Sequence, residues 1–103
     1  MDRRSRDVAA LLEAFVSGRP GLHRGTCFGE PVVYAGRRVA IRGAGAEVAL
    51  RLAPAGRARA MALCPGRVQR WHRGWLYLST RAGRSAGALA SLFEHAVHHV
   101  ATA

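Results

Sequence analysis

RVAIRGAGAEVALRL, residues 38–52, is the clearest structural signal in this chain. Apolar side chains alternate with other residues on both sides of Gly43-Ala44-Gly45, where the two glycines have the backbone freedom that a hairpin turn needs. A period of two gives each strand one buried face. The segment therefore predicts two antiparallel strands, over residues 38–41 and 47–52, that share one side of a sheet.

Short β-rich runs lie before and after this segment. Residues 26–28 and 31–34 precede it, and residues 67–71 and 75–80 follow it. The second pair is joined by His72, Arg73 and Gly74, a short turn in which the glycine can take a positive φ. Together the runs predict an antiparallel meander followed by a second hairpin.

Amphipathic helices are predicted at both ends of the chain. Residues 5–17 have apolar side chains three and four residues apart, and Ser5 is the expected N-cap. Near the C-terminus the same spacing extends over three turns. The apolar residues of this stripe are Leu89, Leu92, Phe93, Ala96, Val97 and Val100.

A short helix is predicted between the two strand groups. Pro54 suits its first turn, and good helix formers continue to residue 63. Ala58, Met61 and Ala62 are the expected inner face. The whole order predicts an α+β fold: an antiparallel sheet of about five or six strands in two hairpin groups, packed against an N-terminal and a C-terminal amphipathic helix, with a short middle helix.

The chain has 103 residues, enough for one hydrophobic core, so residues 1–103 are expected to form a single domain. Its sixteen basic residues are all arginine and oppose six carboxylates, which gives a net charge of +10. Such a charge favours nucleic acid, anionic membrane or an acidic protein as partner. GC-rich coding is the competing explanation, since it also enriches arginine over lysine.

The two cysteines, Cys27 and Cys64, match neither a disulfide framework nor a pair of zinc knuckles, which favours a reducing compartment. The N-terminus lacks a signal-peptide pattern, and no apolar run approaches the length of a membrane span. We therefore expect a cytoplasmic protein without a membrane partner.

Particular residues resemble a known family. The stretch from Cys27-Phe28-Gly29 to Val39-Ala40, then Leu50-Arg51-Leu52 followed by Pro54 and Arg57, and finally Arg73-Gly74-Trp75-Leu76-Tyr77-Leu78, is similar to the pattern of the TfoX N-terminal domain family. The resemblance extends from about residue 6 to 101. It implies a fold related to the MmcQ and YjbR group and an association with transcription, because the best-known members regulate natural competence and also carry a second domain.

Arginines gather in two hairpins and are the candidate nucleic-acid contacts. The later hairpin mixes them with Trp71, Trp75 and Tyr77. Alternation puts Trp75 and Tyr77 on one side of their strand, and inward packing is the structural alternative to stacking on bases. The candidate phosphate-binding residues are Arg37, Arg38, Arg42, Arg67, Arg70, Arg73, Arg81 and Arg84.

Other chemistry is less well supported. His95, His98 and His99 have a spacing that allows metal binding, but they are equally typical of a helix C-terminus, so no metal site is predicted. Cys27 could be a nucleophile with His23 or His72 as its base, although a thiol in or near the core is the simpler interpretation.

The sequence therefore predicts no enzyme and no cofactor. It predicts a binding module of the TfoX N-terminal type that associates with nucleic acid, or with a protein bound to nucleic acid, through an arginine-rich surface. The alternative is a protein-interaction or homodimerising module whose basic surface is incidental.

Overall fold

The computed structural model describes residues 3–45, 47–64, 68–79 and 86–102, which form three helices and six strands. In chain order the elements are α1 (Arg3–Val16), β1 (Leu22–Cys27), β2 (Glu30–Ala35), β3 (Arg38–Ala44), β4 (Glu47–Arg51), α2 (Pro54–Leu63), β5 (Val68–His72), β6 (Trp75–Ser79) and α3 (Ala86–Thr102). All strand pairs are antiparallel. The α+β prediction is therefore confirmed.

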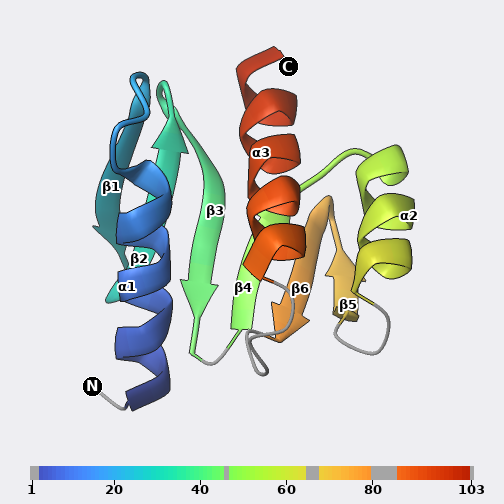
Figure 1. Ribbon diagram of the computed structural model, residues 1–103, viewed down its shortest axis with the longest axis horizontal. Helices are drawn as coiled ribbons and strands as arrows, with labels where there is room; N and C mark the ends of the chain where they lie inside the picture. Colours follow the sequence, from blue (N-terminus) through green and yellow to red (C-terminus); the bar gives the residue numbers. More distant parts are fainter. Residues whose placement is uncertain (1–2, 46, 65–67, 80–85, 103) are drawn as a thin grey trace.

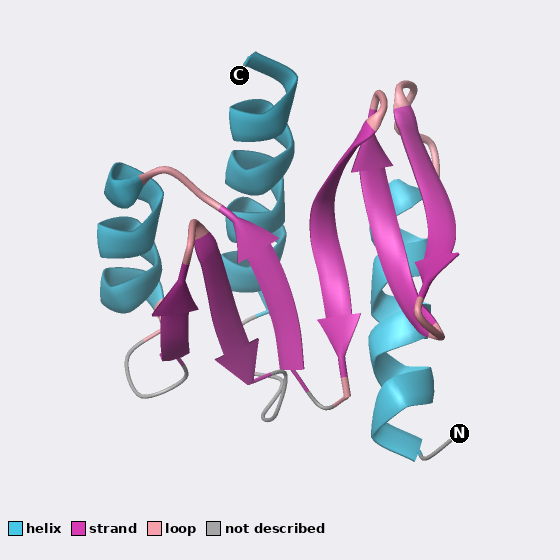
Figure 2. Cartoon of the chain, turned by 180° about the vertical axis from the view of Figure 1, so that it is seen from behind, coloured by secondary structure: helices cyan, strands magenta, loops and turns pink. Residues whose placement is uncertain are grey.

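One sheet contains both hairpin groups, in the strand order β1-β2-β3-β4-β6-β5. The β5–β6 hairpin joins the meander because β6, not β5, pairs with β4. Helices α1, α2 and α3 lie on one side of this sheet (Figure 1), and the strands are in front when the molecule is seen from behind (Figure 2). No helix of the described residues covers that second side, which we call the open face.

The hydrophobic core lies between the helices and the sheet. Leu12, Phe93, Ile41, Leu50 and Leu76 are almost completely buried there. An edge-on aromatic contact links α1 to α3, since the rings of Phe15 and Phe93 lie 5.2 Å apart at 77°. The predicted stripe of α3 packs as expected, with every member buried except the half-buried Val97.

The meander differs from the sequence prediction at two places. β1 begins at Leu22, and Phe28 lies beyond it in the turn, with a φ of 52°. Gly43 belongs to β3 and not to a turn. A Cβ at Gly43 would lie 2.8 Å from the Pro31 ring, so this glycine permits close packing between β2 and β3 instead of chain reversal.

Two helical details also differ. α1 already includes Arg3, so Ser5 lies inside the helix and is not its N-cap. In α2, the residues that enter the core are Ala60 and, at its C-cap, Cys64, whereas the expected inner residues Ala58, Met61 and Ala62 are exposed. The helix itself is rich in alanine and glycine, so its weak apolar periodicity did not show which side faces α3 and the sheet.

The sheet opens at one end between its two halves. The β3–β4 ladder ends at the pair Ile41 and Leu50. Beyond that pair, β3 continues to Arg38 along β2, and β4 continues to Arg51 along β6. The two strands diverge visibly toward the end where α3 finishes (Figure 2).

Among the described helices, none is long and apolar enough to cross a bilayer.

Candidate nucleic-acid interface

Alternation along the central strands determines which side chains reach the open face. Leu76 and Leu78 point into the core, so Trp75 and Tyr77 point the opposite way. The predicted pairing of these two aromatic residues on one side is confirmed, but the side is the open face and not the helix-covered one. Inward packing is wrong because the leucines of β6 occupy the core positions.

Strand register then aligns arginines with these aromatic rings. A row of directly opposed residues crosses four strands, in the order Arg42, Ala49, Tyr77 and Arg70. Arg51 stands opposite Trp75 one step along the same face. The small side chain at Ala49 leaves space above the sheet, into which the longer side chains on either side can lean. We call Arg42, Arg51, Arg70, Trp75 and Tyr77 the arginine–aromatic cluster.

Arg42 lies at the centre of the cluster. Its Nη2 donates a 2.6 Å hydrogen bond to the Tyr77 hydroxyl. Its guanidinium carbon lies 5.2 Å from the ring centre of Trp75 and 6.0 Å from that of Tyr77, both within the range of cation–π attraction. The Nε of Arg42 is buried and has no hydrogen-bond partner. Arg42 is therefore held in place by the rings and is only half-exposed.

Arg70 and Arg51 flank the same rings. The Arg70 guanidinium lies 3.8 Å from the centre of Tyr77, and its Nη1 is 3.3 Å from Oε1 of Glu47. Arg51 lies 5.3 Å from the centre of Trp75, and its Nη1 donates to the carbonyl oxygen of Arg73 over 3.2 Å. Three guanidinium groups are thus fixed beside two rings, with Glu47 as the carboxylate that pairs with the cluster.

Further arginines lie at the turns at one end of the sheet, and among them Arg38 stands opposite the core residue Ala35 and so lies on the helix-covered side. Arg37 and Arg38 lie at the β2–β3 turn, and Arg73 lies at the β5–β6 turn. Arg73 and Gly74 both have a positive φ, of 50° and 84°, which is the conformation of a tight hairpin turn. All three arginines are exposed, and no carboxylate of the described residues pairs with them. Their charges are free to act on a partner.

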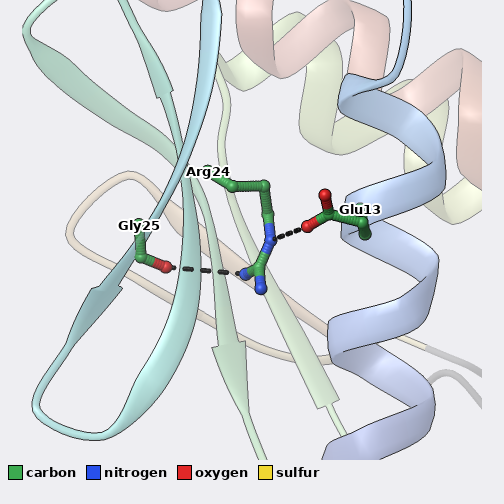
Figure 3. Close-up of polar contacts among 3 residues, drawn as sticks. All are labelled: Glu13, Arg24 and Gly25. Carbon is green, nitrogen blue, oxygen red and sulfur yellow. Dashed lines mark hydrogen bonds and ion pairs between the residues drawn. The ribbon is translucent and has the colours of Figure 1, made fainter.

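On the helix-covered side two arginines pair with carboxylates, whereas the arginines of α2 pair with none of the described carboxylates. Arg24 of β1 extends toward α1, where its Nε lies 2.8 Å from Oε2 of Glu13 (Figure 3). A second, 3.5 Å contact joins its Nη1 to the carbonyl oxygen of Gly25. Arg19 pairs with Glu94 of α3. Two of the chain's six carboxylates are thereby used on this side, and neither lowers the charge of the open face.

The eight candidate residues therefore fall into three groups. Arg42 and Arg70 lie in the arginine–aromatic cluster, and Arg37, Arg38 and Arg73 lie at the adjoining end of the sheet. Arg67, Arg81 and Arg84 lie outside the described residues. Sequence reasoning missed Arg51, although its alternation with the buried Leu50 and Leu52 places it on the open face with Ala49.

The cysteines and histidines form no comparable site. Cys27 is half-buried in β1, whereas His72 lies in β5 at the opposite edge of the sheet. His23 is four residues from Cys27 along one strand, or about 13 Å at the usual rise. In α3, His98 is exposed and His99 half-buried, and the described residues contain no group of three potential metal ligands.

Comparison of the chain with protein-family models, with curated proteins and with solved structures found no match. The resemblance to the TfoX N-terminal domain therefore stays a prediction from the residues themselves, and the geometry of the open face carries the functional argument.

Proposed function

We propose that this chain is a nucleic-acid-binding module that uses the open face of its sheet and the adjoining strand turns. The observation that supports this most is the arginine–aromatic cluster, three guanidinium groups arrayed on two rings, of which Arg70 pairs with Glu47. Arg37 and Arg73, at the adjoining turns, extend the positive surface at one end. Their fields add over this side, and a polyanion that binds there releases counterions.

Recognition on this surface is of phosphates more than of bases. Tyr77 is only 8% exposed, and guanidinium groups lie over both Tyr77 and Trp75. The rings consequently orient the arginines and offer little free surface for a base to stack on. A guanidinium fork held in this way loses less side-chain entropy when it contacts a phosphate. We expect binding with little sequence preference, in keeping with the role of backbone contacts.

The wider setting follows from the resemblance given above. A TfoX N-terminal-like module would act in the cytoplasm in association with transcription, either on nucleic acid directly or beside a protein that is bound to it. The proposal includes no catalytic step.

A salt titration of single-stranded DNA binding tests the proposal. The double variant Arg70→Ala with Arg73→Ala removes one clustered and one turn arginine, both exposed. Loss of two phosphate contacts makes the slope of log K against log salt less negative by roughly 1.5. It also weakens binding without unfolding the protein. The matched control is Arg57→Ala with Arg59→Ala, which removes equal charge from α2 on the other side. An equal effect of both double variants would contradict the proposal, because it would show that binding depends on net charge and not on the open face.

Self-association is the second candidate, and one observation favours it. Phe28 is 98% exposed at the β1–β2 turn, although phenylalanine is usually buried. A homodimer that buries this ring would persist in high salt, because apolar contact is not screened. Sedimentation at low and high salt therefore distinguishes the two candidates, and Phe28→Ser would dissociate the dimer while leaving DNA binding intact.

A further inference from the structure

The opening between β3 and β4 contains a hollow of about 460 Å³. This volume is within the range of small-molecule sites. Its lining comes from both halves of the sheet and from the last turns of α3: Arg38, Val39, Arg51, Trp75, His99 and Val100. The hollow exists because the ladder between the two strands stops at Ile41 and Leu50, before either strand ends.

Charged and apolar groups line this hollow together. Arg38 comes from one side of the opening and Arg51 from the other, and no carboxylate of the described residues pairs with either. His99 adds an imidazole N–H that can donate to an oxygen. Val39 and Val100 supply apolar surface beside these donors. Such a lining suits a ligand with an anionic group at one end and an uncharged, partly apolar body at the other.

The C-terminal end of α3 disfavours an anion in the hollow, but its effect is weaker than that of the two arginines. A helix C-terminus carries roughly half a negative charge, whereas Arg38 and Arg51 bring two full positive charges. The Thr102 hydroxyl also donates to the carbonyl oxygen of His98 over 2.9 Å, which satisfies one of the final carbonyl groups. The balance at the hollow is therefore positive.

We infer that this hollow binds a nucleoside phosphomonoester, with the phosphate between Arg38 and Arg51. A monoester has a charge of about −1.5 to −2 at neutral pH and three free oxygens, whereas an internal phosphodiester has a single charge. Two guanidinium groups from opposite sides of the opening match the monoester better. The sugar and base would lie along Val39, Val100 and the edge of Trp75.

Two sources can supply this chemistry: a free nucleotide, or the phosphorylated end of a nucleic-acid strand. The second source rests on the proposed function, because the strand leading away from the hollow would cross the arginine–aromatic cluster. Arg51 and Trp75 belong to both sites, so a strand whose end is bound in the hollow would reach the arginine–aromatic cluster directly. Arg38 lines the hollow but is not part of the arginine–aromatic cluster, which makes it the residue to test.

The experiment compares two single-stranded decathymidylates, one with a 5′-phosphate and one with a 5′-hydroxyl, and separately titrates adenosine 5′-monophosphate against adenosine. We expect the phosphorylated strand to bind at least fivefold more tightly. Arg38→Gln should abolish this difference while leaving the affinity for the hydroxyl-ended strand within twofold. Arg59→Gln, an equal charge change on the exposed side of α2, should preserve the difference.

Each outcome has a definite meaning. Equal binding of the two strands, together with no binding of the mononucleotide, would overturn the inference and leave the proposed function standing. Mononucleotide binding that is lost in Arg38→Gln, with neither strand bound, would support the hollow and overturn the proposed function. A preference for the phosphorylated strand without mononucleotide binding would identify the strand end as the source.

A spectroscopic measurement on the unaltered protein keeps the test independent of variant folding. Saturating adenosine 5′-monophosphate should shift the indole resonance of Trp75 and the imidazole resonances of His99, which both line the hollow. Trp71 is the internal control, because it packs against the core beneath Arg57 of α2 and does not line the hollow. Equal shifts of both indole resonances would contradict binding at this place.

Discussion

The two faces of the sheet use arginine differently, although each has guanidinium groups beside rings. On the helix-covered side, Arg24 and Arg19 meet the carboxylates of Glu13 and Glu94. On the open face, arginines lie against aromatic rings, and Glu47 is the carboxylate that pairs with them. Pairing with a carboxylate cancels a charge, whereas contact with a ring orients it and leaves it in force. The difference teaches that, among the described residues, it is on the open face that several guanidinium groups converge on shared rings.

The burial of the two faces differs in the same sense. The helix-covered side buries long apolar side chains from every layer, including Phe93 and Leu12. On the open face, Val32, Ala49 and Tyr77 are buried mainly by neighbouring side chains, since no described helix lies above them. The free energy of unfolding should therefore depend chiefly on the helix-covered side, and binding on the open face.

The largest effect is expected for Phe93→Ala. Phe93 is 1% exposed and meets Phe15 edge-on, so its removal leaves a cavity at the centre of the helix-covered core. The free energy of unfolding should fall by about 3–5 kcal/mol, measured by urea denaturation. A midpoint that hardly moves would mean that α3 does not pack on the sheet in this way, and the contrast between the faces would disappear.

A smaller loss is expected for Arg42→Met on the open face. Methionine keeps the apolar stem over the rings but removes the 2.6 Å hydrogen bond to the Tyr77 hydroxyl. It also removes the buried Nε that has no partner, which offsets part of the loss. The free energy of unfolding should fall by about 1 kcal/mol or less. A loss as large as that of Phe93→Ala would show that the open face contributes to stability as a second core.

The smallest effect is a gain in binding. Glu47→Gln removes the partner of Arg70 and leaves that guanidinium free for phosphate. The Arg70 side chain is 56% exposed and that of Glu47 24%, so the pair is only partly screened and the free energy of unfolding should change by about 1 kcal/mol or less. Affinity for single-stranded DNA at low salt should rise about two- to threefold, because one nearby negative charge is lost. Unchanged or weaker binding would place the nucleic acid elsewhere.

Periodicity in the sequence determined most of the elements and the face on which each strand residue lies. The α3 stripe and the alternation around Leu76 and Leu78 are local, since each follows from the turn of a helix or the pleat of a strand. Where the local pattern is weak, as in α2 with its run of small residues, sequence predicted the helix but not its buried side. Gly43 was misassigned to a turn because its close neighbour, Pro31, is twelve residues away.

The candidate site depended on strand order, which no local pattern contains. Arg42, Tyr77 and Arg70 form one row only because β4 pairs with β3 on one side and with β6 on the other. Which arginines find a carboxylate was likewise decided by contacts between distant segments, such as Arg19 with Glu94. Composition and periodicity thus determined that the chain is basic and which residues share a face. Tertiary pairing alone decided which face stays uncovered and where its charges converge, because those outcomes are set by long-range packing free energy.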